Sequence, residues 1–139
     1  MRTAETTLER STTAGTDIHD LSSDLQAFVA STGIDKGLAI LFVPGSTAAL
    51  TTIEFESGAV NDLKRAIEQL APAGAEYEHD LRWGDGNGYS HVRAALMGPS
   101  LIVPVTRGQL ETGTWQQVIL CDFDNRPRQR RILVQVLGT

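Results

Sequence analysis

The segment GDGNGYSH, residues 84–91, gathers Asp85, Asn87 and His91 around three glycines. Glycines permit positive φ angles, so the loop can present these polar side chains on one side. The spacing fits neither the dinucleotide-binding fingerprint nor a P-loop, and an EF-hand count from Asp85 places Ser90 where the sharp turn requires glycine. The segment is therefore either a solvated connection or a loop that holds another kind of ligand.

Two histidines and two aspartates accompany this glycine-rich loop. His79 and Asp80 precede it, and Asp85 and His91 lie within it. Zinc and other first-row divalent ions accept imidazole nitrogens and carboxylate oxygens, and a remote carboxylate such as Glu54 is a candidate further ligand. The alternative is that each histidine is a hydrogen-bonded structural residue. The residue types therefore make a metal site a hypothesis.

His91 is also placed for proton chemistry by a predicted helix over 90–99. If Ser90 caps this helix, His91 lies in its first turn, where the positive end of the helix dipole disfavours imidazolium. A neutral ring binds a metal or accepts a proton. His19 has no such neighbours in the sequence, and we interpret it as a structural residue.

Four arginines lie in the segment NRPRQRR. In a strand, Arg126, Arg128 and Arg130 share one face, and their planar guanidinium groups suit phosphate or carboxylate oxygens. The turn PGSTA adds backbone N–H groups and the hydroxyls of Ser46 and Thr47 as further anion donors. These residues predict a phosphate site. The alternative for the arginines is a solvated strand end whose charge prevents edge pairing.

The sequence also predicts the burial or exposure of three residues in the segment TWQQVILC. Trp115 is either a core residue or an exposed stacking surface, and we expect it in the core. We expect Gln116 on the opposite face, because side chains alternate along a strand. Cys121 lies within an apolar run, which predicts a buried and inert thiol.

Composition favours one globular domain over residues 1–139. Of the 139 residues, 41% are hydrophobic and 21% are charged, and the net charge of −5 argues against a nucleic-acid binder. The single cysteine excludes an internal disulfide and fits a reducing, cytoplasmic compartment. No apolar run approaches the roughly 18 residues that span a bilayer, and residues 1–15 contain no hydrophobic signal core. We therefore expect no membrane contact.

Hydrophobic spacing predicts a mixture of helices and strands without regular β-α-β alternation, which favours an α+β fold. A capping box at Ser23 and Gln26 marks the first helix. We expect residues 37–43 and 49–55 to pair, and the last two strands to form a long hairpin through residues 124–127. The predicted strands cover 5–13, 37–43, 49–55, 101–108, 112–123 and 128–138, and the predicted helices cover 22–33, 59–72 and 90–99.

A family resemblance runs from about residue 5 to residue 138. It is carried by VPGSTAALTTIEFE, HD, DGNGYSHVRAALMGPS, GTWQ, DFDNRPR and VQVLG, taken in order. In these motifs the chain resembles the YjbQ family, also called the secondary thiamine-phosphate synthase family. The resemblance implies a compact α+β domain with a mixed, barrel-like sheet and two principal helices, assembled as a homotrimer with sites near the subunit contacts.

The resemblance also implies an activity, which the word "secondary" describes as a side reaction. A pyrimidine diphosphate joins a thiazole phosphate with release of pyrophosphate, and a divalent ion, zinc or magnesium, stabilises the leaving group. Implied roles are phosphate or substrate binding, metal binding, and proton transfer by Glu54 or His79. The phosphate and substrate residues are Ser46, Thr47, Asn87, Gln116, Arg128 and Arg130, the metal residues are His79, Asp85 and His91, and the catalytic set is Glu54, His79, Asp85 and His91.

The chain departs from the family pattern at three positions. Gly45, Gly84 and Tyr89 stand where relatives carry histidine. These differences weaken a three-histidine zinc site. They leave open a non-catalytic ligand-binding or regulatory trimer, and a metal-dependent hydrolase of an unknown substrate that uses the same loop.

Overall fold

The computed structural model describes residues 1–139. Its helices are α1 (Ser22–Thr32), α2 (Ser57–Leu70), α3 (Glu78–Trp83) and α4 (Gly88–Met97). Its strands are β1 (Arg2–Ser11), β2 (Asp17–Asp20), β3 (Lys36–Phe42), β4 (Ala48–Ile53), β5 (Ser100–Thr106), β6 (Gln109–Leu110), β7 (Gln117–Asp122) and β8 (Gln129–Gly138). The α+β class is as predicted, while β2, α3 and β6 are elements that the sequence patterns did not predict.

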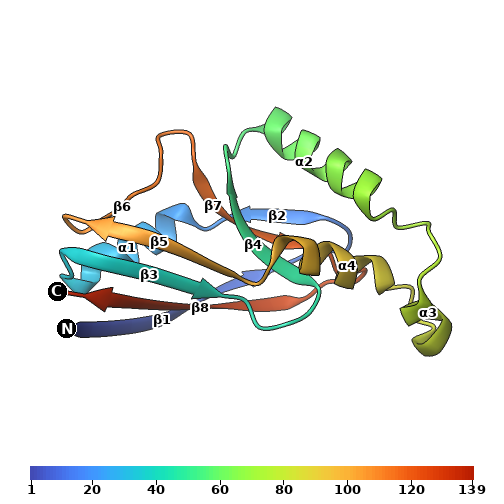
Figure 1. The fold of residues 1–139 in the computed structure, drawn as a ribbon, viewed down its shortest axis with the longest axis horizontal. Coiled ribbons are helices and arrows are strands. Elements are labelled where there is room, and N and C mark those ends of the chain that lie inside the picture. The colour runs from blue at the N-terminus through green and yellow to red at the C-terminus, as the bar shows by residue number, and fades with distance from the viewer.

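The strands form two sheets, ordered β1-β8-β3-β5-β6 and β2-β7-β4. In Figure 1 the larger sheet runs along the length of the molecule, and β4 and β7 rise from it toward α2. The barrel-like curl agrees with the expectation. All strand pairs are antiparallel, however, so the parallel component of a mixed sheet is absent.

Burial on both faces explains the continuous apolar run of β7. Val118 and Leu120 enter the main core, whereas Ile119 and Cys121 face a second core under α2 and α4. Alternating side chains point to opposite faces of a strand, so a strand covered on both sides needs apolar residues at every position. The three-stranded sheet is thus the layer between the two cores.

Two predicted strand pairings are wrong. β7 and β8 do not form a hairpin, because β7 pairs with β2 and β4 while β8 pairs with β1 and β3. β3 and β4 also belong to different sheets. The turn residues 44–47 and 124–127 therefore carry the chain from one sheet to the other, and this brings both segments to the same end of the domain.

Two predicted helix caps are also wrong. The amide of Gln26 bonds Gly108 O and Leu110 N instead of closing a capping box, and Leu21 at the N-cap makes no side-chain cap. Helix α4 starts at Gly88 with Asn87 at its N-cap, so Ser90 does not cap it. His91 still lies in the first turn. None of the four helices is long and apolar enough to cross a bilayer.

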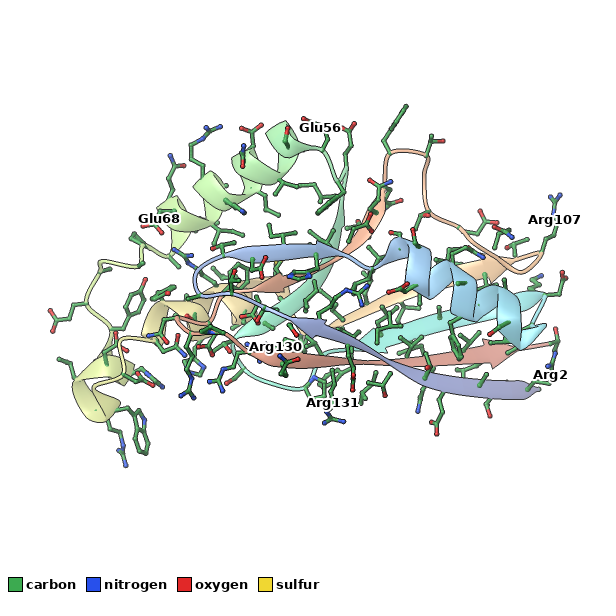
Figure 2. The ribbon with its side chains drawn as sticks, turned by 180° about the vertical axis from the view of Figure 1, so that it is seen from behind. Arg2, Glu56, Glu68, Arg107, Arg130 and Arg131 are labelled. Carbon is green, nitrogen blue, oxygen red and sulfur yellow. The ribbon has the colours of Figure 1, made fainter.

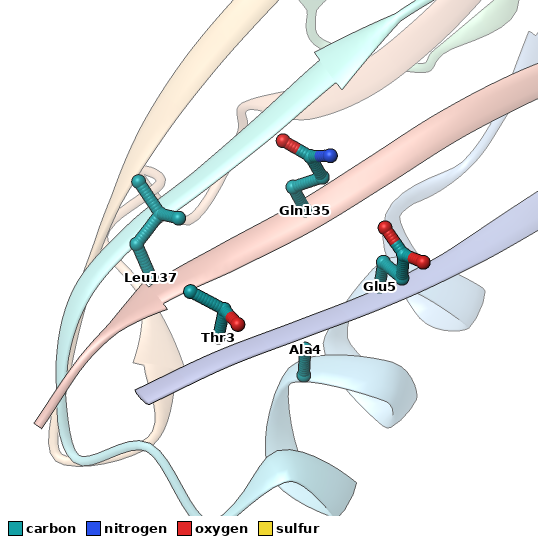
Figure 3. A pocket seen from close by; sticks show the side chains of 5 residues that line it. All are labelled: Thr3, Ala4, Glu5, Gln135 and Leu137. Carbon is teal, nitrogen blue, oxygen red and sulfur yellow. The ribbon is translucent and has the colours of Figure 1, made fainter. Parts of the chain in front are cut away.

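The outer face of the five-stranded sheet carries exposed apolar side chains. Leu38 and Phe42 on β3, Ile102 on β5 and Leu133 on β8 are all solvent-exposed, and Phe42 is directly opposite Leu133. The β1 side of this face is polar, with a shallow hollow lined by Thr3, Ala4, Glu5, Gln135 and Leu137 (Figure 3). None of the predicted site residues lies in that hollow.

Candidate functional site

The short helix α3 and the glycine-rich loop bring two histidines and two aspartates together. His79 Nδ1 lies 3.4 Å from Asp80 Oδ1 and 3.3 Å from Asp85 Oδ1. The rings of His79 and His91 have centroids 4.4 Å apart and are tilted by 44°. The structure therefore assembles the predicted set of His79, Asp85 and His91, and it adds Asp80.

Glycine at position 88 permits this close approach. A Cβ there would lie 2.5 Å from Tyr77 Cβ and 3.1 Å from Asp80 Oδ1. The backbone N–H of Gly88 donates to Asp80 Oδ1 at 2.8 Å, which fixes one carboxylate oxygen beside His79. Gly84 has a left-handed φ of 65° and ends α3, so the chain can turn back toward α4. These two glycines position the cluster.

The cluster fits the donor set of a divalent ion. His79 Nδ1 and one oxygen each of Asp80 and Asp85 lie within 4.8 Å of one another. In a tetrahedral zinc site with bonds of about 2.0–2.1 Å, ligand atoms are about 3.3 Å apart, close to the two distances from His79. Without an ion, the contact between His79 Nδ1 and Asp80 Oδ1 serves as a hydrogen bond between imidazole and carboxylate.

Asn87 is predicted to bind substrate, but in the structure its side chain holds two segments of the protein together. It is 6% exposed, and its Oδ1 accepts from Ser90 Oγ at 2.6 Å and from the backbone N–H of Asn125 at 3.1 Å. Asn125 Nδ2 in turn donates to Asp85 O at 2.8 Å. These bonds attach the glycine-rich loop to the segment between β7 and β8, and they leave Asn87 little capacity for a ligand.

Arg130 is held in a buried network with two fully buried aspartates. Its Nε donates to Asp122 Oδ2 at 2.7 Å, and its Nη2 donates to Thr47 Oγ1 at 2.6 Å and Asp122 Oδ1 at 3.2 Å. Arg130 is only 7% exposed, whereas its neighbour Arg131 is exposed and labelled beside it in Figure 2. Arg130 and Thr47 therefore neutralise and satisfy buried carboxylates.

Arg128 differs from Arg130 in its accessibility. Its Nε donates to Asp124 Oδ2 at 3.0 Å, while its terminal nitrogens have no protein partner and the side chain is 36% exposed. Burial alone would raise the pKa of Asp124, but hydrogen bonds from Thr47 and Arg128 lower it below its ordinary value. Arg128 is thus the arginine of this network that still has free donors for an anion.

A hollow of about 250 Å³ lies next to the histidines, between residues 45–48 and α4. Ser46 and His91 both line it, and Ser46 is exposed with no protein partner for its hydroxyl. The hollow therefore combines an imidazole and a hydroxyl beside the cluster of His79, Asp80 and Asp85.

Glu54 and Gln116 are not part of this arrangement. Thr47 precedes β4 and Glu54 follows it, so at about 3.3 Å per residue the two lie roughly 20 Å apart along the strand. Gln116 bonds Thr52 Oγ1 and the backbone N–H of Gly113 near that far end. Trp115 is 72% exposed there, so its predicted place in the core is wrong.

Two other expectations concern residues outside the site. Cys121 is fully buried, and burial raises the pKa of its thiol to about 12, which confirms an inert cysteine. His19 pairs with Asp17, with 2.9 Å between Nε2 and Oδ2, in agreement with a structural residue.

Comparison with known proteins places the chain in a family. The family described as "UPF0047 protein YjbQ-like" matches residues 6–139. The chain belongs to this family. It is 37% identical to a UPF0047 protein of Archaeoglobus fulgidus, over 87% of this chain and 91% of the relative. It is 34% identical to the UPF0047 protein YugU of Bacillus subtilis, over 95% of this chain and 98% of the relative.

Two solved structures share the fold over its full length. A YbjQ-like protein of unknown function from Sulfolobus solfataricus superposes with a TM-score of 0.89 at 27% identity, covering 99% of this chain and 100% of that one. A hypothetical protein from Aeropyrum pernix gives a TM-score of 0.85 at 27% identity, with both chains fully covered. The family and its fold are thereby established for this chain.

Two contributors to the site are not predicted from the sequence, namely Asp122 and Asp124, which bind the arginines. Asp80 is grouped with the histidines in the sequence, but the predicted metal set contains only His79, Asp85 and His91. The signal for Asp122 and Asp124 was present, because DFD directly precedes the arginine-rich segment. Two carboxylates that lie two positions apart at the end of a buried strand need cations nearby, because a buried charge is costly unless it is paired.

Proposed function

We propose that this UPF0047 protein is a divalent-metal-dependent enzyme that acts on a phosphorylated small molecule, of the thiamine-phosphate synthase type that the family resemblance implies. The observation that carries the proposal is the cluster of His79, Asp80 and Asp85 beside His91, which itself lines the hollow with Ser46. The residues that would supply metal ligands, a base and an anion donor thus lie at one end of the domain.

The side chains divide the chemistry among them. His79, Asp80 and Asp85 would hold zinc or magnesium, and the bound ion would stabilise negative charge on a phosphate or pyrophosphate leaving group. The free terminal N–H groups of Arg128 would donate hydrogen bonds to a phosphate, and Ser46 would offer its hydroxyl. His91 is the side chain placed to accept a proton inside the hollow.

Elemental mass spectrometry of the purified protein tests the metal. We expect about one zinc or other divalent ion per chain, and a metal content at background in His79→Ala and Asp85→Asn. The matched control is His19→Ala, which removes a histidine of similar exposure that lies on β2 and pairs with Asp17, and this variant should keep the metal. Equal metal content in all variants would contradict the site.

An activity assay then identifies the reaction. The protein is incubated with the pyrimidine diphosphate and the thiazole phosphate, and both thiamine phosphate and free phosphate are quantified. Thiamine phosphate formation that is lost in Asp85→Asn supports the transferase. Release of inorganic phosphate from either substrate alone, lost in the same variant, supports the metal-dependent hydrolase instead.

A second candidate is a ligand-binding protein without turnover. It is favoured by the distance between the histidine cluster and Glu54, and by the full engagement of Arg130 with Asp122 and Thr47. In that case phosphate binding, measured by calorimetry, would weaken in Arg128→Ala, and no product would form in either assay.

We also infer a homotrimer and a cytoplasmic location. The exposed apolar side chains of β3, β5 and β8 would be covered by neighbouring copies, because soluble chains rarely leave such a patch in water. The single buried cysteine suits a reducing compartment.

A further inference from the structure

We propose that the hollow at the carboxyl end of β4 is a second binding site, which takes a small organic ammonium ion. It is lined by Trp115 and Phe55 and by the carboxylates of Asp20, Glu54 and Glu56, and it encloses about 350 Å³. We name it the Trp115 hollow. It lies at the opposite end of β4 from the histidine cluster and does not depend on the function proposed there.

Hydrogen bonds hold the loop that carries Trp115 beside Phe55, at the end of β4. Gln117 Oε1 accepts from the backbone N–H of Phe55 at 2.8 Å, and Gln116 bonds Thr52 Oγ1 at 3.1 Å. Both glutamines thus tie the loop that carries Trp115 to the end of β4. Because these bonds hold the loop in place, the 72% exposure of Trp115 is a feature of the fold.

The charge of the hollow has one sign. No lysine or arginine lines it, and none of its three carboxylates forms an ion pair. Asp20 accepts from the N–H of Ser22, and Glu56 accepts from the first N–H groups of α2. The side-chain carboxylate of Glu54 has no hydrogen-bond partner in the protein, so it is available to a ligand. An anionic ligand is disfavoured by this charge.

The spacing of the carboxylates favours an organic cation over a metal ion. Asp20, Glu54 and Glu56 line the same hollow, but their carboxylate oxygens do not all lie within 4.8 Å of one another, as the ligand atoms of the histidine cluster do. A bare divalent ion needs its ligand atoms to lie within about this distance of one another. An alkylammonium ion is larger, spreads its charge over its surface, and interacts with a tryptophan face and with carboxylates at the same time.

Trp115 differs from two other aromatic residues because no arginine or lysine of the protein covers its ring. Trp83 is also exposed, but the guanidinium of Arg82 lies 5.3 Å from its ring centroid. Arg93 lies 4.7 Å from the ring centroid of Tyr89. No protein cation covers Trp115, so its ring face remains open to a cation from solution.

Titration with tetramethylammonium chloride, followed by the indole N–H resonances in ¹H–¹⁵N NMR spectra, tests the site. We expect a saturable shift of the Trp115 resonance and none of the Trp83 resonance. tert-Butanol, which is similar in size and neutral, and sodium chloride at equal ionic strength serve as ligand controls. Glu54→Gln should weaken binding about two- to fivefold through loss of one charge.

The variants separate this site from the histidine cluster. Trp83→Leu and His79→Ala should leave binding of tetramethylammonium unchanged, and Trp115→Leu should abolish it, as measured by calorimetry. Trp115 is exposed, so its replacement should fold, and Glu54→Gln tests the same site independently. An unsaturable shift, or the same shift with tert-butanol or sodium chloride, would overturn the proposal whatever the metal content of the protein.

Discussion

Gly45 lies directly against the guanidinium of Arg130, and a Cβ at residue 45 would be 2.8 Å from Arg130 Nη1. Gly45 also has a φ of 127°, a backbone conformation that is nearly restricted to glycine. The other nitrogens of Arg130 are bound to Asp122 and Thr47, so the guanidinium cannot withdraw without breaking buried bonds. In this chain a side chain at position 45 would therefore compete for space with Arg130 of the buried network.

Gly45→Ala should lower the free energy of unfolding by about 2–4 kcal/mol, from backbone strain together with displacement of Arg130. Urea denaturation measures this change. Gly15→Ala is the matched control, because Gly15 has a φ of 94° but a Cβ added there would have no atom within 4 Å. A loss in Gly45→Ala no larger than in Gly15→Ala would show that contact with Arg130 adds nothing to strain.

Replacing Arg130 should be more damaging than replacing its neighbour. Arg130→Met leaves the fully buried carboxylate of Asp122 without its cation, which should cost about 3–5 kcal/mol of unfolding free energy. Arg131→Met, at the exposed next position of β8, should change it by less than about 0.5 kcal/mol. Denaturation curves of similar slope for both variants would make the two values comparable, and equal values would refute the structural role of Arg130.

Asp124 should make stability fall in acid. Its pKa is lower in the folded protein than the ordinary 3.8, because hydrogen bonds from Thr47 and Arg128 outweigh the effect of burial. The unfolded chain therefore binds the proton at a higher pH than the folded protein does. This stabilisation is complete above about pH 5 and disappears as the pH falls through the lower, folded-state pKa.

Asp124→Asn should be less stable than the wild-type protein at pH 7 but should lose less stability between pH 6 and pH 3. Urea midpoints at several pH values across this interval measure the difference. Parallel losses in the two proteins would mean that other carboxylates cause the acid sensitivity.

The main helices and most strands were predictable because their signals are local. The Val60, Leu63, Ile67 and Leu70 spacing of α2 needs no tertiary information. The pairing of β7 was not predictable in this way, because a turn such as residues 124–127 looks the same whether it closes a hairpin or connects two sheets. What decides the pairing is burial on both faces of β7, which involves residues distant in sequence.

The candidate site shows the same division. His79, Asp85 and His91 could be grouped because they lie within 13 positions of one another, and the structure brings them together. Asp80 depends on α3, which at six residues is too short for a periodic signal. Trp115 was misplaced because β7 begins only at Gln117, so strand alternation does not extend to it.

The proposed homotrimer can be tested on the outer face of the five-stranded sheet. Sedimentation velocity should show a species near three times the 15.0 kDa chain mass. Ile102→Glu places a charge among the exposed apolar residues of β3 and β5, and it should shift the protein toward monomer because burial of an unpaired carboxylate opposes association. Gln69→Glu adds the same charge on an exposed position of α2 and should leave the assembly intact. If the wild-type protein sediments as a monomer, or if Ile102→Glu remains trimeric, this face is not the subunit contact.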